Sequence, residues 1–129
     1  MPPRTPTPLP GSPVRGSRTG RPIMALLDLL GRRWALRVLW ELREEPSPTF
    51  RELQKRCGAV SSSVLADRLH ELDEAAIVTR SDRGYTLTPA GADLLGRLLT
   101  LDEWASRWAS SQAASARAVT PGNTADDSQ

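Results

Sequence analysis

Residues 61–72 of the chain read SSSVLADRLHEL, and this stretch decides the fold. Leu65, Leu69 and Leu72 recur at intervals of four and three, and Ala76 extends the series by another four. Such spacing is typical of an amphipathic helix that turns one face to a core. The three serines that open the stretch can cap its first turn through their hydroxyl groups. We therefore predict a helix whose leucines point inward and whose serine tip stays exposed.

A shorter helix is expected immediately before this one. Residues 49–52 read TFRE, so the Thr49 hydroxyl and the Glu52 carboxylate can form a capping box, and Gly58 ends the helix. A competing interpretation makes residues 48–50 a very short strand. Two helices joined by a turn and packed on a third are the arrangement of a helix-turn-helix. Residues 33–44 are apolar nearly all round, which predicts a third helix that is central and buried on most sides.

The remaining elements complete a winged helix. Residues 23–30 keep helical spacing and stop at Gly31. Residues 77–80 (IVTR) and 85–88 (YTLT) alternate with a period of two, and Gly84 supplies the positive φ that a tight hairpin needs. Thr88 then caps a last helix over about residues 89–110. The predicted fold class is mainly α with a small β-hairpin: a three-helix core, a two-stranded wing and extra terminal helices.

The last helix carries more apolar surface than a small core can absorb. We expect the surplus to meet a second copy of the chain, because large exposed apolar patches usually mark an interface. A monomer with a fully internal last helix is the alternative. The residues that we assign to dimerisation are Leu27, Leu98, Leu101, Trp104, Ala105 and Trp108.

Length and composition exclude several classes of protein. The chain has 129 residues, 39% of them hydrophobic, which is enough for one domain with a modest core. Its longest apolar run spans residues 23–27, far short of the roughly 20 residues that cross a bilayer. One cysteine (Cys57) and one histidine (His70) build neither a disulfide scaffold nor a Cys/His zinc site, and they offer no catalytic triad. Prolines, not an apolar segment, follow the basic N-terminus, so no secretory signal is expected. We expect a cytoplasmic domain with no metal, no cofactor, no catalytic residues and no membrane partner.

The net charge of +2 is unevenly distributed. Residues 1–22 hold Arg4, Arg15, Arg18 and Arg21 without an acid, whereas residues 23–110 and residues 111–129 each carry a net charge of −1. Residues 1–21 are also rich in proline and poor in apolar groups, so we predict a disordered basic arm there. This arm is either a solvated tail or a segment that follows DNA phosphates. Residues 22–110 form the winged helix-turn-helix domain, and residues 111–129 are expected to be a second disordered tail.

Five blocks of the sequence resemble a known family in unbroken order. They are residues 30–34 (LGRRW), 38–42 (VLWEL), 50–54 (FRELQ), 64–72 (VLADRLHEL) and 85–91 (YTLTPAG). Together they resemble the HxlR-type transcriptional regulators, a MarR-like branch of the bacterial winged-helix proteins. The resemblance implies a homodimeric, cytoplasmic regulator that binds double-stranded DNA at promoters.

Three departures from the family pattern limit what the resemblance carries over. Family members often have a cysteine before the proline that precedes the first helix, and some use it to sense oxidants; here Arg21 precedes Pro22. Cys57 lies at the end of the helix that begins near Thr49, at a position that is usually apolar in the family, so we expect it to be a packing residue and not a sensor. The wing is short, and Ala76 stands where a glycine is common before the hairpin.

In a helix-turn-helix the second helix enters the major groove with its N-terminal residues at the base edges. Arg68 is the one cation in the first two turns of that helix, where it either contacts DNA or pairs with Glu71. Arginines of the preceding helix and of the hairpin are candidates for contacts with the DNA backbone or the minor groove. The candidate DNA-binding residues are Ser61, Ser62, Ser63, Ala66, Asp67, Arg68, Arg51, Arg80 and Arg83.

We expect a repressor that acts as a homodimer on a pseudo-palindromic promoter site. The alternative is a winged-helix module that binds another protein, which the near-neutral domain and the serines at the recognition positions favour. A small-molecule effector, if one exists, is expected at the dimer junction, where helix shifts change the distance between the two recognition helices.

Overall fold

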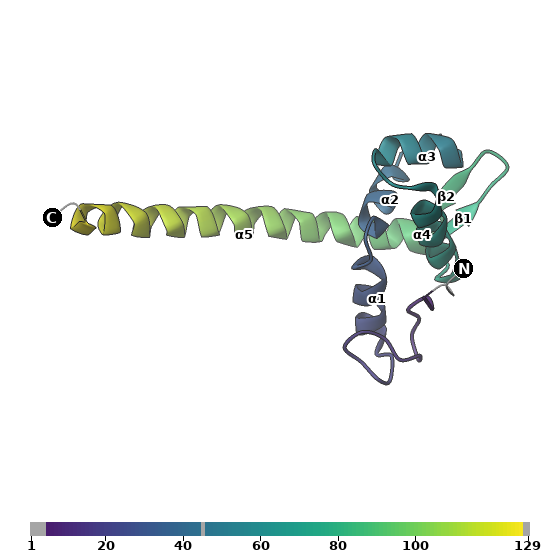
Figure 1. The fold of residues 1–129 in the computed structure, drawn as a ribbon, viewed down its shortest axis with the longest axis horizontal. Helices are drawn as coiled ribbons and strands as arrows, with labels where there is room; N and C mark the ends of the chain where they lie inside the picture. Colours follow the sequence, from purple (N-terminus) through teal and green to yellow (C-terminus); the bar gives the residue numbers. More distant parts are fainter. Residues whose placement is uncertain (1–4, 45, 128–129) are drawn as a thin grey trace. The chain divides into compact units, whose positions relative to one another are not determined.

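The computed structural model describes residues 5–44 and 46–127, and the chain divides into two compact units, Met1–Leu95 and Gly96–Gln129. Figure 1 labels the elements, whose order confirms the prediction of a winged helix with a two-stranded wing. They are α1 (Pro22–Leu30), α2 (Ala35–Glu41), α3 (Phe50–Cys57), α4 (Ser62–Glu74), β1 (Val78–Arg80), β2 (Tyr85–Leu87) and α5 (Pro89–Asp127).

The core of the first unit is built around the inner face of α4. Leu65 and Leu72 are fully buried, and Leu69 is nearly so. Helix α2 packs against α1, α3 and α4, so Val38 and Leu39 are buried from several sides. Burying one such side chain contributes about 1.5–3 kcal/mol to stability. The leucine spacing thus predicted the side of α4 that faces inward.

Helix α2 differs from the prediction in length and burial. It begins at Ala35, because Trp34 adopts a left-handed backbone conformation with φ of 77°, and it ends at Glu41. Helix α2 has about two turns and is contacted by α1, α3 and α4. These helices leave one side of α2 uncovered, and Leu36 and Trp40 are exposed there. The guanidinium carbon of Arg43 lies 3.8 Å from the centre of the Trp40 ring and partly covers it. The predicted central position of this helix is confirmed, but one side of α2 is open to solvent, so it is less completely buried than predicted.

The predicted capping box at the start of α3 is present. The Thr49 hydroxyl accepts a hydrogen bond from the backbone N–H of Glu52 at 3.2 Å, and the Glu52 carboxylate accepts one from the backbone N–H of Thr49 at 3.1 Å. The hydrogen bonds from Thr49 hold the pKa of Glu52 below its ordinary value. Gly58 ends the helix with φ of 87°, a conformation that favours glycine.

The wing is a two-stranded antiparallel hairpin in which Val78 pairs with Leu87 and Arg80 with Tyr85. Its second strand also touches the segment before α3, because the backbone N–H of Tyr85 donates to the carbonyl oxygen of Pro48 at 2.9 Å. A Cβ at Gly84 would lie 2.0 Å from that oxygen, so close approach requires glycine there. The alternative strand at residues 48–50 is reduced to this one hydrogen bond, since α3 begins at Phe50.

Helix α5 starts as predicted. The Thr88 hydroxyl accepts a hydrogen bond from the backbone N–H of Gly91 at 3.0 Å and donates to the carbonyl of Ala76 at 2.6 Å. A Cβ at Gly91 would lie 2.0 Å from the carbonyl oxygen of Ile77. Thr88 and Gly91 therefore fasten the start of α5 to the chain between α4 and the wing.

Both predicted tails take a different form in the structure. The described part of the arm, residues 5–21, follows a defined path against α1 and α4, with hydrogen bonds to Asp28, Arg32 and Glu74 and with Pro8 buried. Residues 111–127 continue helix α5 and do not form the separate tail that we expected. Residues 1–4 and 128–129 lie outside the described residues.

Ala76 does not belong to the inward series of α4. It lies beyond the end of the helix, is exposed and has a φ of 60°. An alanine in this conformation costs roughly 1–2 kcal/mol, which exceeds the roughly 0.5–1 kcal/mol of chain entropy that a glycine adds. We therefore expect Ala76→Gly to raise the free energy of unfolding by about 0.5–1 kcal/mol in urea titrations.

The neighbouring residue provides the control for this substitution. Ala75 has a φ of −81°, which suits alanine, so Ala75→Gly is expected to lower stability. Equal effects of the two substitutions would contradict the explanation by backbone strain.

Candidate nucleic-acid interface

The N-terminal end of α4 presents three hydroxyl groups, and we call Ser61, Ser62 and Ser63 the recognition tip. All three are exposed. The Ser61 hydroxyl caps the helix by accepting from the backbone N–H of Val64 at 3.2 Å, and its oxygen lies 3.4 Å from that of Ser63. Ala66 is exposed one turn further along. The tip is therefore open for contact, with Ser62 and Ser63 as its outward hydroxyls.

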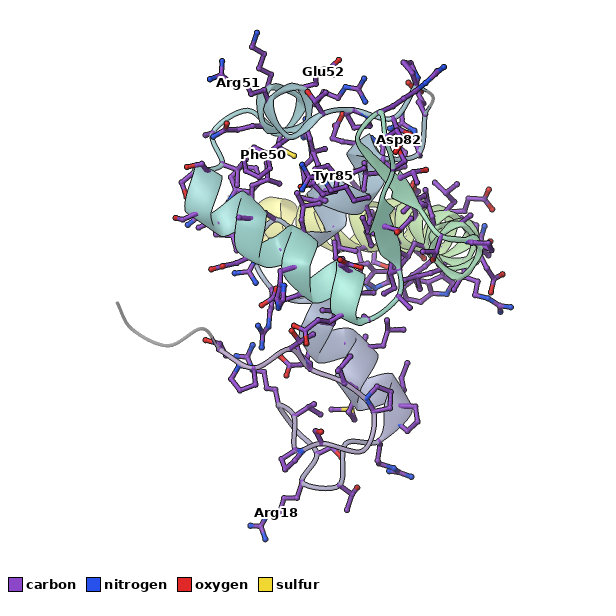
Figure 2. The ribbon with its side chains drawn as sticks, turned by 90° about the vertical axis from the view of Figure 1, so that its right-hand side faces the viewer. Arg18, Phe50, Arg51, Glu52, Asp82 and Tyr85 are labelled. Atoms are coloured by element: carbon purple, nitrogen blue, oxygen red, sulfur yellow. The ribbon has the colours of Figure 1, made fainter. Side chains whose placement is uncertain are left out.

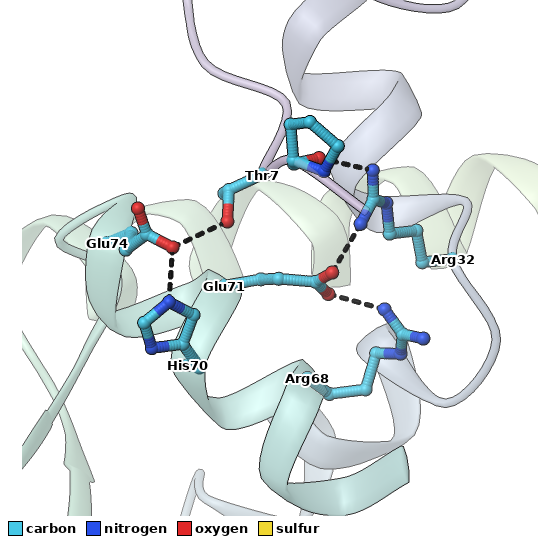
Figure 3. A network of polar contacts seen from close by, with 7 residues as sticks. Thr7, Arg32, Arg68, His70, Glu71 and Glu74 are labelled. Carbon is cyan, nitrogen blue, oxygen red and sulfur yellow. Dashed lines mark hydrogen bonds and ion pairs between the residues drawn. The ribbon is translucent and has the colours of Figure 1, made fainter. Parts of the chain in front are cut away.

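Arg68 is held away from the recognition tip. Its guanidinium pairs with one oxygen of Glu71, while Arg32 from the α1–α2 connection pairs with the other oxygen (Figure 3). The Glu71 side chain is only 2% exposed, and the Arg68 side chain is 16% exposed. The Arg68–Glu71 pair lies within α4, and Arg32 joins this pair to the α1–α2 connection. Of the two alternatives given for Arg68, pairing with Glu71 agrees with the structure better than a contact with DNA does.

The candidate cations of α3 and the wing are all exposed. Figure 2 shows Arg51 on α3 pointing away from the body of the unit, and Phe50 and Tyr85 line a shared pocket between α3 and the wing. Arg83 lies in the hairpin turn, and the guanidinium carbon of Arg80 lies 5.7 Å from the centre of the Tyr85 ring. Acids accompany them, since Glu52 and Asp82 lie next to Arg51 and Arg83 in the chain.

Two further residues belong to this surface and were not among the candidates. Lys55 is exposed on α3, four residues after Arg51, and this spacing places both cations on one side of the helix. His70 is exposed on α4 and pairs with Glu74 at 2.6 Å between Nε2 and Oε1. The candidate Asp67 is half-buried and also has an interaction partner. The i, i+4 spacing of Arg51 and Lys55 was the sequence signal available for Lys55.

The residues assigned to dimerisation fall in both units, and each unit has an apolar surface. In the first unit Leu27 and Ile23 are exposed on α1, at a spacing of one helical turn. In the second unit Leu101, Trp104 and Trp108 are each more than half exposed. The two indole rings stack with their centres 6.0 Å apart. Leu98 and Ala105 of the same helix are half-buried.

Cys57 lies at the end of α3 and is buried. Burial raises the pKa of its thiol, and the nearby Glu41 carboxylate adds to the effect. A protonated, covered thiol is a poor nucleophile, so Cys57 has the properties of a packing residue.

Among the described residues no cluster of His, Cys, Asp or Glu side chains has the arrangement of a metal site. The described helices likewise include none long and apolar enough to span a bilayer.

The three-helix core, the exposed tip of α4 and the cationic hairpin define a winged helix-turn-helix. Residues 29–113 match the family model described as HxlR-like helix-turn-helix. The chain belongs to this family of transcriptional regulators, as the resemblance implied.

Individual relatives agree with this assignment. The chain is 29% identical over 85 residues to the HTH-type transcriptional regulator BH0655 of Halalkalibacterium halodurans, covering 60% of this chain and 75% of that protein. It is similar to the quinone-bound YodB of Bacillus subtilis, with 32% identity, a TM-score of 0.61, and coverage of 66% of this chain and 96% of that one. A MarR-family regulator from Enterococcus faecalis V583 gives a TM-score of 0.64 at 28% identity, covering 70% and 88% of the two chains.

Proposed function

We propose that the chain represses transcription by binding a pseudo-palindromic promoter site as a homodimer, with α4 of each protomer in the major groove. The observation that carries this proposal is the exposed recognition tip, with exposed cations on α3 and on the hairpin in the same unit. A helix-turn-helix docks with its second helix in the groove and its first helix across the backbone. Arg51 and Lys55 on α3 then face phosphates.

The residues on α4 favour modest sequence discrimination. The hydroxyls of Ser62 and Ser63 can donate to or accept from several base edges, and Ala66 can touch a thymine methyl group. With Arg68 paired to Glu71, no guanidinium from the first two turns of α4 is offered to a guanine. Affinity then depends mainly on Arg51, Lys55, Arg80 and Arg83, which are exposed and which we assign to contacts with phosphates.

We propose that the apolar surfaces of α1 and α5 form the dimer contact. Leu27 of the first unit and Leu101, Trp104 and Trp108 of the second are each more than half exposed, and grouped apolar side chains on a surface commonly mark an interface. A two-fold dimer presents two copies of α4, which explains the expected pseudo-palindrome. Sedimentation equilibrium measures the state directly, and a monomer at micromolar concentration contradicts this part of the proposal.

Repression is the simplest outcome for a dimer of this size, since occupying a promoter excludes polymerase without a dedicated activating surface. A possible small-molecule effector remains a prediction, placed at the dimer junction. Quinone binding is stated for YodB and is a property of that protein. Covalent attachment of a quinone to Cys57 of this chain is disfavoured, because Cys57 is buried and the pKa of its thiol is raised.

The salt dependence of binding tests the proposed function. We expect fluorescence anisotropy on the promoter of the chain's own gene to show an affinity that falls log-linearly with salt. Four phosphate contacts per protomer predict a slope of about −7 for the dimer, at about 0.9 per contact. Random duplex of the same length should bind more weakly. No binding to either duplex at low salt would favour the alternative, a winged helix that binds protein.

A further inference from the structure

The N-terminal arm is tied to the C-terminal half of α4. The Thr7 hydroxyl donates to Oε1 of Glu74 at 2.8 Å, and the Pro6 carbonyl accepts a hydrogen bond from Arg32 at 2.8 Å. Arg32 in turn pairs with the buried Glu71, so the arm joins the network that anchors α4 (Figure 3). Pro8, the next proline, is buried. The position of the arm relative to α4 is therefore fixed within the first unit.

The second half of the arm closes on itself as a loop, which we call the basic loop (residues 14–21). Val14 and Ser17 exchange two backbone hydrogen bonds of 2.9 and 3.0 Å, and the Ser17 hydroxyl accepts from the backbone N–H of Arg21 at 3.0 Å. The base of the loop is closed by a hydrogen bond of 2.9 Å from Gly11 N–H to the Gly20 carbonyl. Gly20 is buried with φ of 69°.

The basic loop presents cations without neighbouring acids in the sequence. Arg15, Arg18 and Arg21 are all exposed, and the first acid of the chain is Asp28. That carboxylate accepts from the backbone N–H of Arg15 at 3.1 Å, so one negative charge lies beside the loop. Figure 2 shows Arg18 projecting outward at the end of the unit opposite to Arg51 and Asp82. The loop is thus a positive surface separate from Arg51 and from the hairpin turn.

We propose that the basic loop is a second DNA-binding surface, which contacts the phosphate backbone flanking the segment that α4 occupies. The inference rests on the proposed function and extends it. Guanidinium groups on a short loop suit phosphate oxygens, and they carry no sequence information. Because the loop is ordered before DNA arrives, binding does not carry the entropy cost of ordering a mobile tail. Arg18 lies at the end of the unit opposite to Arg51, so we assign the loop to phosphates outside the segment that α3 and α4 contact (Figure 2).

The test compares two triple variants that lose the same charge. One replaces Arg15, Arg18 and Arg21 with glutamine; the other replaces Arg97, Arg107 and Arg117, which are exposed on α5. Anisotropy is measured on a 50-bp duplex containing the bound promoter segment, over a range of salt concentrations. We expect the loop variant to bind at least 10-fold more weakly at 100 mM salt. Its slope should be shallower by about 1–3 per protomer, at about 0.9 per lost contact. The α5 variant should match the wild type.

Two further measurements vary the length of the duplex and the geometry of the basic loop. On a duplex trimmed to the recognised segment, the loop variant should bind like the wild type, because the flanking phosphates are gone. Gly20→Ala keeps every charge, but its Cβ would lie 2.2 Å from the Ser12 carbonyl oxygen and distort the loop. We expect Gly20→Ala to weaken binding to the 50-bp duplex about 3-fold or more, with an unchanged circular dichroism spectrum.

Each outcome decides between the two proposals. If the wild type binds with a steep salt slope and the loop variant is indistinguishable from the α5 variant, the basic loop is not a DNA surface, while the proposed function stands. If Gly20→Ala binds like the wild type, the fixed geometry of the loop plays no part and the inference fails in that respect. If the wild type binds no duplex at all, the proposed function falls and the inference falls with it.

Discussion

Replacing Ser62 with glutamate should abolish tight DNA binding without harming the fold. Ser62 is exposed at the first position of α4, where the proposed docking brings the recognition tip against the duplex. A carboxylate there faces phosphates, and like charges across an interface cost several kcal/mol. We expect affinity for the promoter duplex to fall at least 100-fold, which corresponds to about 2.7 kcal/mol. The fold is spared because an acid in the first turn of a helix interacts favourably with the helix dipole.

Two control variants isolate the effect of charge at this position. Ser62→Gln has a similar volume and no charge, and it should lose much less affinity. Ser115→Glu adds the same charge on the exposed surface of α5 and should bind nearly as the wild type does. If Ser62→Glu retains wild-type affinity on anisotropy titration, the recognition tip does not face DNA and the proposed docking is wrong.

Replacing Glu71 with alanine should produce the largest loss of stability among the polar residues discussed above. The substitution leaves Arg32 and Arg68, both largely buried, close together without their shared carboxylate. Removing one partner of a buried ion pair typically costs about 3–5 kcal/mol. The partial exposure of the two arginines favours the lower end, so we expect a loss of about 3 kcal/mol in the free energy of unfolding.

Glu74→Ala is the matched comparison on the same helix. Glu74 is 43% exposed and pairs with His70, and exposed pairs contribute about 0–1 kcal/mol. Urea titrations of the two variants should therefore differ by at least about 2 kcal/mol. A small, equal loss in both would show that water replaces Glu71 as a partner for the two arginines.

The sequence predicted those elements whose signals are local. The leucine period of α4, the capping box of Thr49 and Glu52, and the glycine of the hairpin all act within one or two turns of chain. Such patterns specify secondary structure and the buried face together. The fold class could therefore be predicted without knowledge of any long-range contact.

The surroundings of the candidate site were predicted less completely, because they depend in part on long-range contacts. For Arg68 the local pairing with Glu71 was one of the two alternatives, but the contact of Arg32 with the same carboxylate, 39 residues away in the chain, was not foreseen. The order of the arm depends on Thr7 meeting Glu74, 67 residues away. Composition alone predicted disorder there, since hydrogen bonds to distant residues leave no periodic signal.

The extent of α2 and the role of Ala76 were missed for backbone reasons. Trp34 and Ala76 both adopt a positive φ, which residues other than glycine seldom do. No pattern of apolar residues reveals such a conformation. A glycine is common in the family at the position of Ala76. That glycine was the available hint, because it indicates a turn more than an inward-facing helical residue.

The two sides of α4 have separate roles, and this division has a consequence for how such a regulator can change its target. Leucines and Glu71 secure the inner side, whereas Ser62, Ser63 and Ala66 face outward and support nothing else in the core. Mutations at the outward positions can accumulate at little thermodynamic expense. Under the proposed docking, retargeting the protein to a new operator, by evolution or in the laboratory, begins at these three positions without prior stabilisation of the scaffold.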